Sequence, residues 1–580
     1  MKTFALALFA LVAATVSATP HYPQFLNRET QNLDGTWRFH WFGTNVAVAA
    51  VTPATACRDI AAVPGLFDTA LSRFGQRGTA LYQRTVCAKA GLQRLIIGGL
   101  GLYGKVWWDD QLLGEVKLPY SEIHFDFENA TDGEHRLTIL VDNQFKNAPL
   151  FKPDYDFYGY GGIYRSVHLQ TLPAQRLETV SIQTLDLKGR IRVNVTTANV
   201  SDNAYPVIVG FDDAKERQTI AVDIVNNAGS FELTVPNAAA WSPATPNLHT
   251  LLIGHASDLR IERFGLRTIT TQGRKILLNN KEIKLFGVNR HEAHPQLGPV
   301  SNTHLMLEDI QLVKYLNGNF IRAVHYQHDP EFYELCDEAG LLVWAESLGW
   351  GLNHTALLDN QALILEETRM LGTLTANHPS VIINGFLNEC ASDHAAVLPL
   401  YQKLSQTLRA TAPNALVSFA SNRLQKDKCF SVCDVVSLNY YPGWIWPIAS
   451  DRPSSEQIPD YIADLAKWFD DPANKDVYDK PLITSETGCC GVYGVRDRAL
   501  AQWSEEYQAD YLKVSIQSSM SNPRFSGVTI WQMFDTRSYV NMGQVRGKFR
   551  GYNNAGLLDE YRRPKLAYDE VRTLFGTLNR

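Results

Sequence analysis

The sequence lacks a charge imbalance, low-complexity segments and long hydrophobic runs beyond its first residues. Over 580 residues, 54 Lys and Arg stand against 60 Asp and Glu, which gives a net charge of −6. Proteins that bind nucleic acids or anionic membranes usually carry basic clusters or a basic excess. After residue 20, no stretch is apolar for long enough to cross a bilayer. We therefore expect neither nucleic acid nor a membrane as a partner.

Cysteine is also scarce, with eight in the chain. The last four lack the Cys-x-x-Cys and histidine spacing of zinc sites, so we expect no metal and no other cofactor. Two pairs are near enough in sequence to form disulfides: Cys57 with Cys87, and Cys429 with Cys433. A bridge between the adjacent Cys489 and Cys490 is a further hypothesis, because spacing alone does not determine connectivity.

The first 18 residues have the pattern of a secretory signal peptide. Lys2 supplies a positive start, residues 4–16 are almost wholly apolar, and Val16-Ser17-Ala18 is a small-residue cleavage pattern. We therefore predict a secreted protein that is cleaved after Ala18. Four Asn-x-Ser/Thr sequons would then be candidates for glycosylation: Asn129, Asn194, Asn199 and Asn353.

A chain of this length is too long for one hydrophobic core, so several domains are expected. Residues 19–170 contain short alternating strands separated by Gly, Asn, Asp and Pro, which predicts a β-sandwich. Residues 171–268 repeat this pattern in a unit of immunoglobulin size. From 269 to 580, compact apolar runs alternate with amphipathic helical stretches, which is typical of parallel βαβ units.

Eight candidate strands can be counted in this last region, and eight strands in roughly 300 residues fit a (β/α)₈ barrel. They cover residues 284–290, 320–326, 341–346, 381–389, 416–421, 435–441, 481–486 and 527–534. The predicted fold class is therefore a multidomain protein, in which two β-sandwiches precede a TIM barrel.

Several of these strands end in polar or aromatic residues. Glu389 closes the fourth strand and Glu486 the seventh, while Glu346 closes the third. The carboxyl ends of barrel strands meet at one rim, where active sites are built. A single polar strand end is more often a solvated loop residue, but the convergence of several on one rim predicts an active site.

Two carboxylates facing each other at a barrel mouth are the requirement for glycoside hydrolysis. One protonates the leaving oxygen, and the other attacks the opposite face of the anomeric carbon if the two lie about 5 to 5.5 Å apart. We expect Asn388 to hold a sugar hydroxyl and Tyr441 to hydrogen-bond Glu486. Glu346 is the rival for a catalytic role.

The sequence resembles glycoside hydrolase family 2 over essentially the whole mature chain. The resemblance implies a jelly-roll sandwich, an immunoglobulin-like sandwich and a catalytic barrel, with Glu389 as acid/base, Glu486 as nucleophile and Glu346 in a supporting place. Three segments carry it, at residues 286–292, at 377–381 continuing to Asn388-Glu389, and at 481–488.

Within that family the sequence is most similar to the β-glucuronidase subgroup, through residues 103–107, 162–167, 503–508 and 562–565. This resemblance implies that Asp156, from a sandwich loop, reaches the barrel to bind sugar hydroxyls. It also implies a pocket lined by His291, Asn388, Tyr441 and Trp531.

The sequence departs from this subgroup at its Asn-x-Lys motif, which holds the sugar carboxylate. The matching segment keeps Asn553 but has Ala555 where the lysine should stand. A buried carboxylate without a cation is costly, whereas a neutral group is not. Three basic residues just upstream are possible substitutes: Arg546, Lys548 and Arg550.

We therefore expect a secreted, retaining exo-β-glycosidase for a neutral galactose-type sugar in a glycan or glycoside. Because it lacks this lysine, the sequence resembles secreted β-galactofuranosidases, and this is the activity that we expect first. β-Galactosidase or arabinosidase activity is the next expectation. The alternative is a β-glucuronidase with a degenerate Asn-x-Lys motif, and a non-catalytic carbohydrate-binding protein is more remote. A homo-oligomer is possible.

Overall fold

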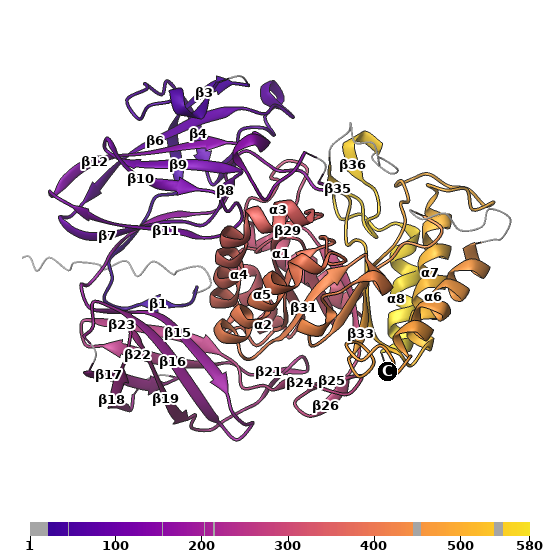
Figure 1. Cartoon of the computed structure of the whole chain (residues 1–580). Helices are drawn as coiled ribbons and strands as arrows, with labels where there is room; N and C mark the ends of the chain where they lie inside the picture. The colour runs from indigo at the N-terminus through magenta and orange to yellow at the C-terminus, as the bar shows by residue number, and fades with distance from the viewer. Residues whose placement is uncertain are drawn as a thin grey trace, which may run out of the picture.

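The computed structural model describes residues 21–44, 46–153, 155–201, 203–212, 215–444, 454–538 and 549–579. The predicted signal peptide, residues 1–18, lies outside these ranges. Figure 1 shows two β-sandwiches on one side of an α/β barrel. In the described residues, no helix is long and apolar enough to cross a membrane.

The first sandwich pairs a six-stranded sheet, β10-β9-β12-β6-β3-β4, with a four-stranded sheet, β11-β7-β14-β2. The alternation of buried and exposed residues along these strands fills one core between the sheets, which includes Trp37, Val106 and Leu137. The strands are β2 Thr30–Asn32, β3 Gly35–Gly43, β4 Asp59–Val63, β6 Thr79–Ala88, β7 Gly91–Ile97, β9 Tyr103–Trp108, β10 Gln111–Val116, β11 Ile123–Asn129, β12 Gly133–Asp142 and β14 Val167–Thr171.

The second sandwich has a five-stranded sheet, β1-β23-β22-β17-β18, and a three-stranded sheet, β15-β16-β19. The short strand β1 pairs with β23, so the first described strand joins the second sandwich rather than the first. The strands are β1 Gln24–Phe25, β15 Arg176–Thr184, β16 Arg190–Ala198, β17 Asn203–Phe211, β18 Arg217–Ile224, β19 Ala228–Thr234, β22 His249–His255 and β23 Asp258–Phe264.

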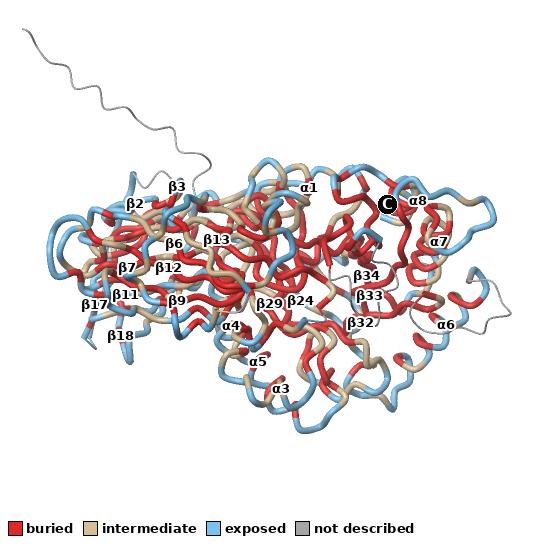
Figure 2. Tube along the Cα trace, turned by 90° about the horizontal axis from the view of Figure 1, so that it is seen from above, coloured by how far each residue is buried: buried red, intermediate tan, exposed pale blue. Residues whose placement is uncertain are grey.

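Eight parallel strands close into a barrel, which confirms the predicted fold class. The ends of every strand lie within four residues of the predicted ends. All residues of the eight strands are buried except Trp350, which is half-buried at the end of β29, and Figure 2 shows this buried centre in red. The strands are β27 Leu285–Arg290, β28 Phe320–Ala323, β29 Leu342–Trp350, β30 Val381–Asn388, β31 Leu416–Ser421, β32 Val436–Asn439, β33 Leu482–Thr487 and β34 Phe525–Ile530.

Helices surround the barrel, and α1, α2, α3 and α7 each begin at a residue whose side chain caps the helix. In α2, the Asp329 side chain accepts from Glu331 N, Pro330 opens the helix, and Gly340 ends it at φ 68°. The helices are α1 Thr303–Tyr315, α2 Pro330–Ala339, α3 His354–Asp359, α4 Gln361–Thr375, α5 Leu398–Thr411, α6 Ser454–Phe469, α7 Glu505–Ser521 and α8 Leu566–Leu578.

The first sandwich docks on the carboxyl ends of the barrel strands through a buried polar contact. Arg165 Nη2 donates to Glu292 Oε2 at 2.8 Å and to the Gln327 carbonyl at 2.7 Å. Beside this contact, Tyr120 of the sandwich stacks on Tyr326 of the barrel with ring centroids 3.8 Å apart. The sandwich therefore forms part of the wall around the barrel mouth.

The predicted disulfides are not formed. All eight cysteines lie in the described residues, and each is a free thiol. Cys57 Sγ lies 3.7 Å from the carbonyl of Leu81 on β6, whereas Cys87 stands six residues further along that strand. At about 3.3 Å per residue, this separation is roughly 20 Å, too far for a bridge. The two other pairs, Cys429 with Cys433 and Cys489 with Cys490, are buried thiols.

The four predicted glycosylation sequons differ in exposure. Asn129 is 4% exposed, and its Nδ2 donates to the carbonyls of Lys89 and Thr131, so this nitrogen is not accessible for a glycan. Asn199 and Asn353 are exposed, and Asn194 is half-buried. Asn194, Asn199 and Asn353 therefore remain the candidate glycosylation sites.

Candidate active site

Glu486, on β33, has two strong hydrogen-bond donors. Arg322 Nη1, from β28, lies 2.6 Å from Glu486 Oε1, and the Tyr441 hydroxyl donates to Glu486 Oε2 at 2.6 Å. The expected contact between Tyr441 and Glu486 is thus present. Burial and the charge of Glu486 raise the pKa of Tyr441 well above its usual range, so the phenol keeps its proton and donates. This arrangement stabilises Glu486 as a carboxylate.

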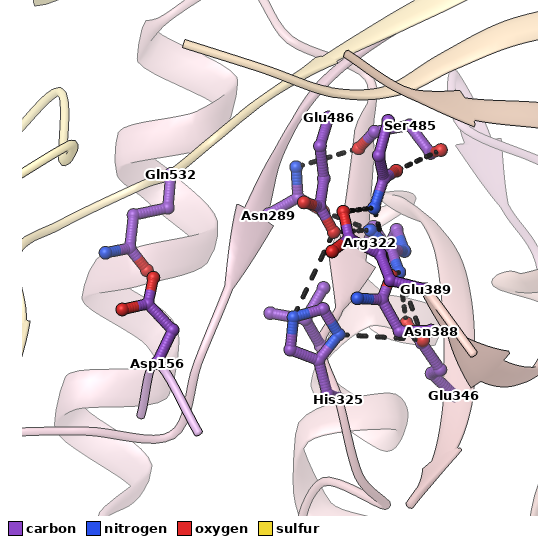
Figure 3. A network of polar contacts seen from close by, with 12 residues as sticks. Asp156, Asn289, Arg322, His325, Glu346, Asn388, Glu389, Ser485, Glu486 and Gln532 are labelled. Carbon is purple, nitrogen blue, oxygen red and sulfur yellow. Dashed lines mark hydrogen bonds and ion pairs between the residues drawn. The ribbon is translucent and has the colours of Figure 1, made fainter. Parts of the chain in front are cut away.

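Arg322 joins several of the predicted site residues. Its Nη2 donates to Asn388 Oδ1 at 2.7 Å and pairs with Glu346 Oε2 at 2.9 Å, and its Nη1 also donates to Asn289 Oδ1 at 3.1 Å. Figure 3 shows these side chains converging around the guanidinium. Arg322 was not among the predicted site residues, although an arginine within the apolar strand Phe320–Ala323 was an available signal in the sequence.

Glu389 lies directly after β30 and is held by amides rather than by a cation. Asn439 Nδ2 donates to Glu389 Oε1 at 2.9 Å, and Asn422 Nδ2 donates to Oε2 at 3.1 Å. Its backbone adopts the left-handed region, with φ 54°, which is uncommon for a residue other than glycine and typical of active sites. Burial and then the charge of Glu486 raise the pKa of Glu389 to about 8. The group therefore keeps its proton at neutral pH.

Glu346 is excluded from a comparable role by its surroundings. Burial alone would raise its pKa, but Arg322 and His325 outweigh that effect and lower it. Its Oε1 lies 3.6 Å from His325 Nδ1. Glu346 is therefore an ionised partner of Arg322 and a poor proton donor.

An aromatic wall stands beside the two carboxyl groups. His325 stacks on Trp531 with centroids 5.3 Å apart, and His291 meets Trp531 edge-on at 5.6 Å. Phe157, from the sandwich loop, lies 5.0 Å from His291. Burial, followed by the neighbouring histidines His325 and His328, lowers the pKa of His291 well below its usual range, so its ring is neutral.

The predicted reach of Asp156 into the barrel is present in the structure. Its Oδ2 accepts a hydrogen bond from Asn553 Nδ2, although the two residues are 397 positions apart in sequence. Figure 3 shows Gln532 pointing toward Asp156. Ala555 is buried, and its N–H donates to Asn553 Oδ1 at 3.1 Å. The barrel thus supplies the carboxyl pair and Asn553, and the first sandwich adds Asp156 through this contact.

No lysine or arginine takes the place of the missing lysine among the described residues that contact Asn553. Arg550, which was predicted to bind substrate, has a side chain that is 53% exposed, and its Nη2 pairs with Glu560 Oε1 at 3.1 Å rather than with Asn553. Lys565 is buried but already bound to Asp535 Oδ1 and to the carbonyls of Gly491 and Asn554. Arg546 and Lys548 lie outside the described residues.

The described part of the chain contains no group of three or more His, Cys, Asp or Glu side chains arranged to hold a metal ion. Two carboxyl groups in opposite environments, Glu389 and Glu486, form the centre of the site.

Comparison with known proteins agrees with this geometry. Residues 269–579 match the family model of the glycosyl hydrolases family 2 TIM barrel domain, and residues 67–173 match its sugar binding domain. A family 2 β-galacturonidase from Eisenbergiella tayi, solved with galacturonate bound, is 32% identical with a TM-score of 0.85, over 95% of this chain and 98% of that one.

Two curated β-glucuronidases are also similar. The protein from Paenibacillus borealis is 25% identical over 446 residues, which is 73% of this chain and 71% of the relative. The human protein is 27% identical over 437 residues, 71% of this chain and 63% of the relative. The chain therefore spans about two thirds of the length of these relatives.

Proposed function

Because the chain belongs to glycosyl hydrolase family 2 and is a glycoside hydrolase, we propose that it is a retaining exo-β-glycosidase. Glu389 is the acid/base and Glu486 the nucleophile. The observation that carries this proposal is the opposite environment of the two groups: Glu486 faces the Arg322 cation, whereas burial and the charge of Glu486 hold a proton on Glu389.

In the first step, Glu486 Oε attacks the anomeric carbon while Glu389 gives its proton to the leaving oxygen, so the glycosidic bond breaks and a glycosyl-enzyme ester forms. In the second step, Glu389, now ionised, removes a proton from water, whose oxygen displaces Glu486 from the sugar. The anomeric configuration is retained because two inversions occur. Asn388, Asn439 and Asn422 lie on the Glu389 side and support binding and proton transfer.

For the sugar, the relatives favour an acid over the neutral galactofuranose expected from the sequence, because they are a β-galacturonidase and β-glucuronidases. Galacturonate combines this acid group with the galactose configuration, so a β-galacturonide is our first candidate and a β-glucuronide the second. Ala555 favours the competing neutral sugar, since no described cation contacts Asn553. The Asp156–Asn553 contact supplies hydroxyl-binding groups for either.

A panel of p-nitrophenyl glycosides tests this proposal: the β-galacturonide, β-glucuronide, β-galactofuranoside, β-galactopyranoside and α-arabinofuranoside. We expect the highest kcat/KM for a uronide. Fastest release from the galactofuranoside would reinstate the neutral-sugar expectation, and ¹H NMR of the first-formed product would contradict a retaining mechanism if the anomer were inverted.

Secretion is a second part of the proposal, supported by the apolar run at residues 4–16 and the small residues before Thr19. Expression in a eukaryotic host should place the enzyme in the medium with Thr19 at its N-terminus. Edman sequencing would decide this, and a retained, uncleaved chain would refute it.

A further inference from the structure

A cluster of guanidinium groups and aromatic rings lies where the first sandwich meets the barrel. It consists of Phe74, Arg77, Phe145 and Tyr158 from the sandwich and Arg537 from the barrel. The carbon at the centre of the Arg537 guanidinium lies 3.8 Å from the Tyr158 ring centroid and 4.0 Å from that of Phe74. Arg77 lies 4.2 Å from the Tyr158 centroid and 4.8 Å from that of Phe145. Tyr158 is thus contacted by two cations.

The rings of Tyr158 and Phe74 are close partners of the Arg537 guanidinium. The residue is 6% exposed, and its Nη1 is buried without a hydrogen-bond partner in the part of the chain that the structure describes. The buried carboxyl group of Asp68 interacts electrostatically with Arg537 and Arg77, but no direct ion pair to Arg537 forms among the described residues. A desolvated cation that lacks such a direct pair is costly unless another group compensates it. The negative faces of aromatic rings offer such compensation, and a planar guanidinium fits them better than an ammonium.

The same residue also binds the sandwich loop through its backbone. Its carbonyl accepts a hydrogen bond from Tyr158 N at 3.0 Å. Two residues earlier in this loop, Asp156 accepts from Asn553. The short strands β35 Thr536–Arg537 and β36 Tyr552–Asn553 pair so that Thr536 faces Asn553 and Arg537 faces Tyr552. Because neighbouring strand residues point to opposite faces, the loop is attached to both faces of this ribbon.

We propose that Arg537 is a positioning residue for sugar binding: it clamps Tyr158, and the clamp holds Asp156 against Asn553 at the sugar end of the pocket. This inference rests on the proposed function for its catalytic consequence but not for its structural one. Arg537 itself lies on the ribbon face opposite Asn553, so it acts through the loop rather than on the sugar.

The test compares Arg537→Met with Arg537→Lys and with the control Arg572→Met. Arg572, on helix α8, also lies over a tyrosine ring, 4.3 Å from the Tyr315 centroid, but its side chain is 42% exposed. With the p-nitrophenyl glycoside that the wild type cleaves fastest, Arg537→Met should raise KM about tenfold and change kcat by less than about twofold. Arg537→Lys should give a smaller rise, and Arg572→Met none. An unchanged KM with a lower kcat would refute the proposal.

A double-mutant cycle shows whether the effect passes through Asp156. In an Asp156→Ala background, Arg537→Met should raise KM no further, because the group that it positions is already gone. Tyr158→Phe, which keeps the ring but loses the hydroxyl beside Asp68, should raise KM less than Tyr158→Leu, which should resemble Arg537→Met. A full additional KM rise in the Asp156→Ala background would overturn the proposed route.

Hydrogen–deuterium exchange separates this inference from the proposed function, since it needs no turnover. In Arg537→Met, amides of residues 155–160 should exchange about tenfold faster, while amides in the barrel strands stay protected. Unchanged exchange in this loop would refute the clamp even if the enzyme proved active, and faster exchange would support it even if every substrate in the panel failed.

Discussion

Glu389 offers the sharpest prediction, because its protonation state should determine how activity depends on pH. Its pKa is raised from 4.5 to about 8 by burial and by the charge of Glu486. At pH 7, a carboxyl group with a pKa of about 8 is protonated in about 90% of molecules, against less than about 1% at a pKa of 4.5. The acid form is lost as pH rises through the raised pKa. Hence kcat/KM of the wild type should fall about tenfold per pH unit above about pH 8.

Glu389→Ala removes the acid and should abolish this alkaline limb. For a methyl glycoside, whose leaving group needs a proton, kcat/KM should drop by about 10² to 10⁴. For a 2,4-dinitrophenyl glycoside, whose leaving group departs as a stable anion, the first step should change much less. Azide should then rescue turnover and give a glycosyl azide with retained configuration, because it attacks the glycosyl-enzyme without general-base help.

Stopped-flow kinetics and a pH profile from pH 5 to 10 measure these effects, with Glu389→Gln as an isosteric control. If kcat/KM of Glu389→Ala still fell above about pH 8, the group that titrates there would be a residue other than Glu389. Equal losses for the methyl and dinitrophenyl glycosides would show that Glu389 supports the fold or binding rather than proton transfer.

Four further substitutions test other parts of the site. Glu486→Gln should abolish turnover while leaving sugar binding largely intact by calorimetry; residual turnover near the wild-type rate would contradict its role as nucleophile. Arg322→Met should lower the free energy of unfolding by about 3 to 5 kcal/mol, since it leaves Glu346 and Glu486 as buried charges without their cation, and a Tm near that of the wild type would contradict this. Lys565→Met should lower the free energy of unfolding by a similar amount, because it leaves the buried Asp535 carboxyl group without its cation. Ala555→Lys should raise kcat/KM for β-glucuronides about tenfold, relative to an Ala555→Met control, if the carboxylate lies beside Asn553.

The barrel was predictable because local pattern determines it. Strands such as β31 and β33 are compact apolar runs between amphipathic helices, and each matches its predicted range closely. Once eight such strands are counted, the shared rim of a barrel places Glu389 and Glu486 together without further information. The contact between Tyr441 and Glu486 followed from the same reasoning.

Sequence spacing says little about direction in space, and the structure places several predicted residues away from their expected partners. Cys57 and Cys87 are close in number, but an extended strand carries Cys87 away from the place where Cys57 lies. Arg550 is three residues from Asn553, yet it turns outward to Glu560. Asn129 begins a sequon, but its side-chain nitrogen donates hydrogen bonds to two backbone carbonyls.

By itself, then, the sequence determined the barrel, the two catalytic candidates and the family, since each depends on a continuous segment read in order. Tertiary structure decided how those candidates differ in charge. Arg322 reaches Glu486 from 164 positions away, and Asp156 meets Asn553 across 397. Protonation and positioning depend on which groups come within a few ångströms of each other and on how much water is excluded there. Both arise only when the barrel closes and the sandwich docks against it.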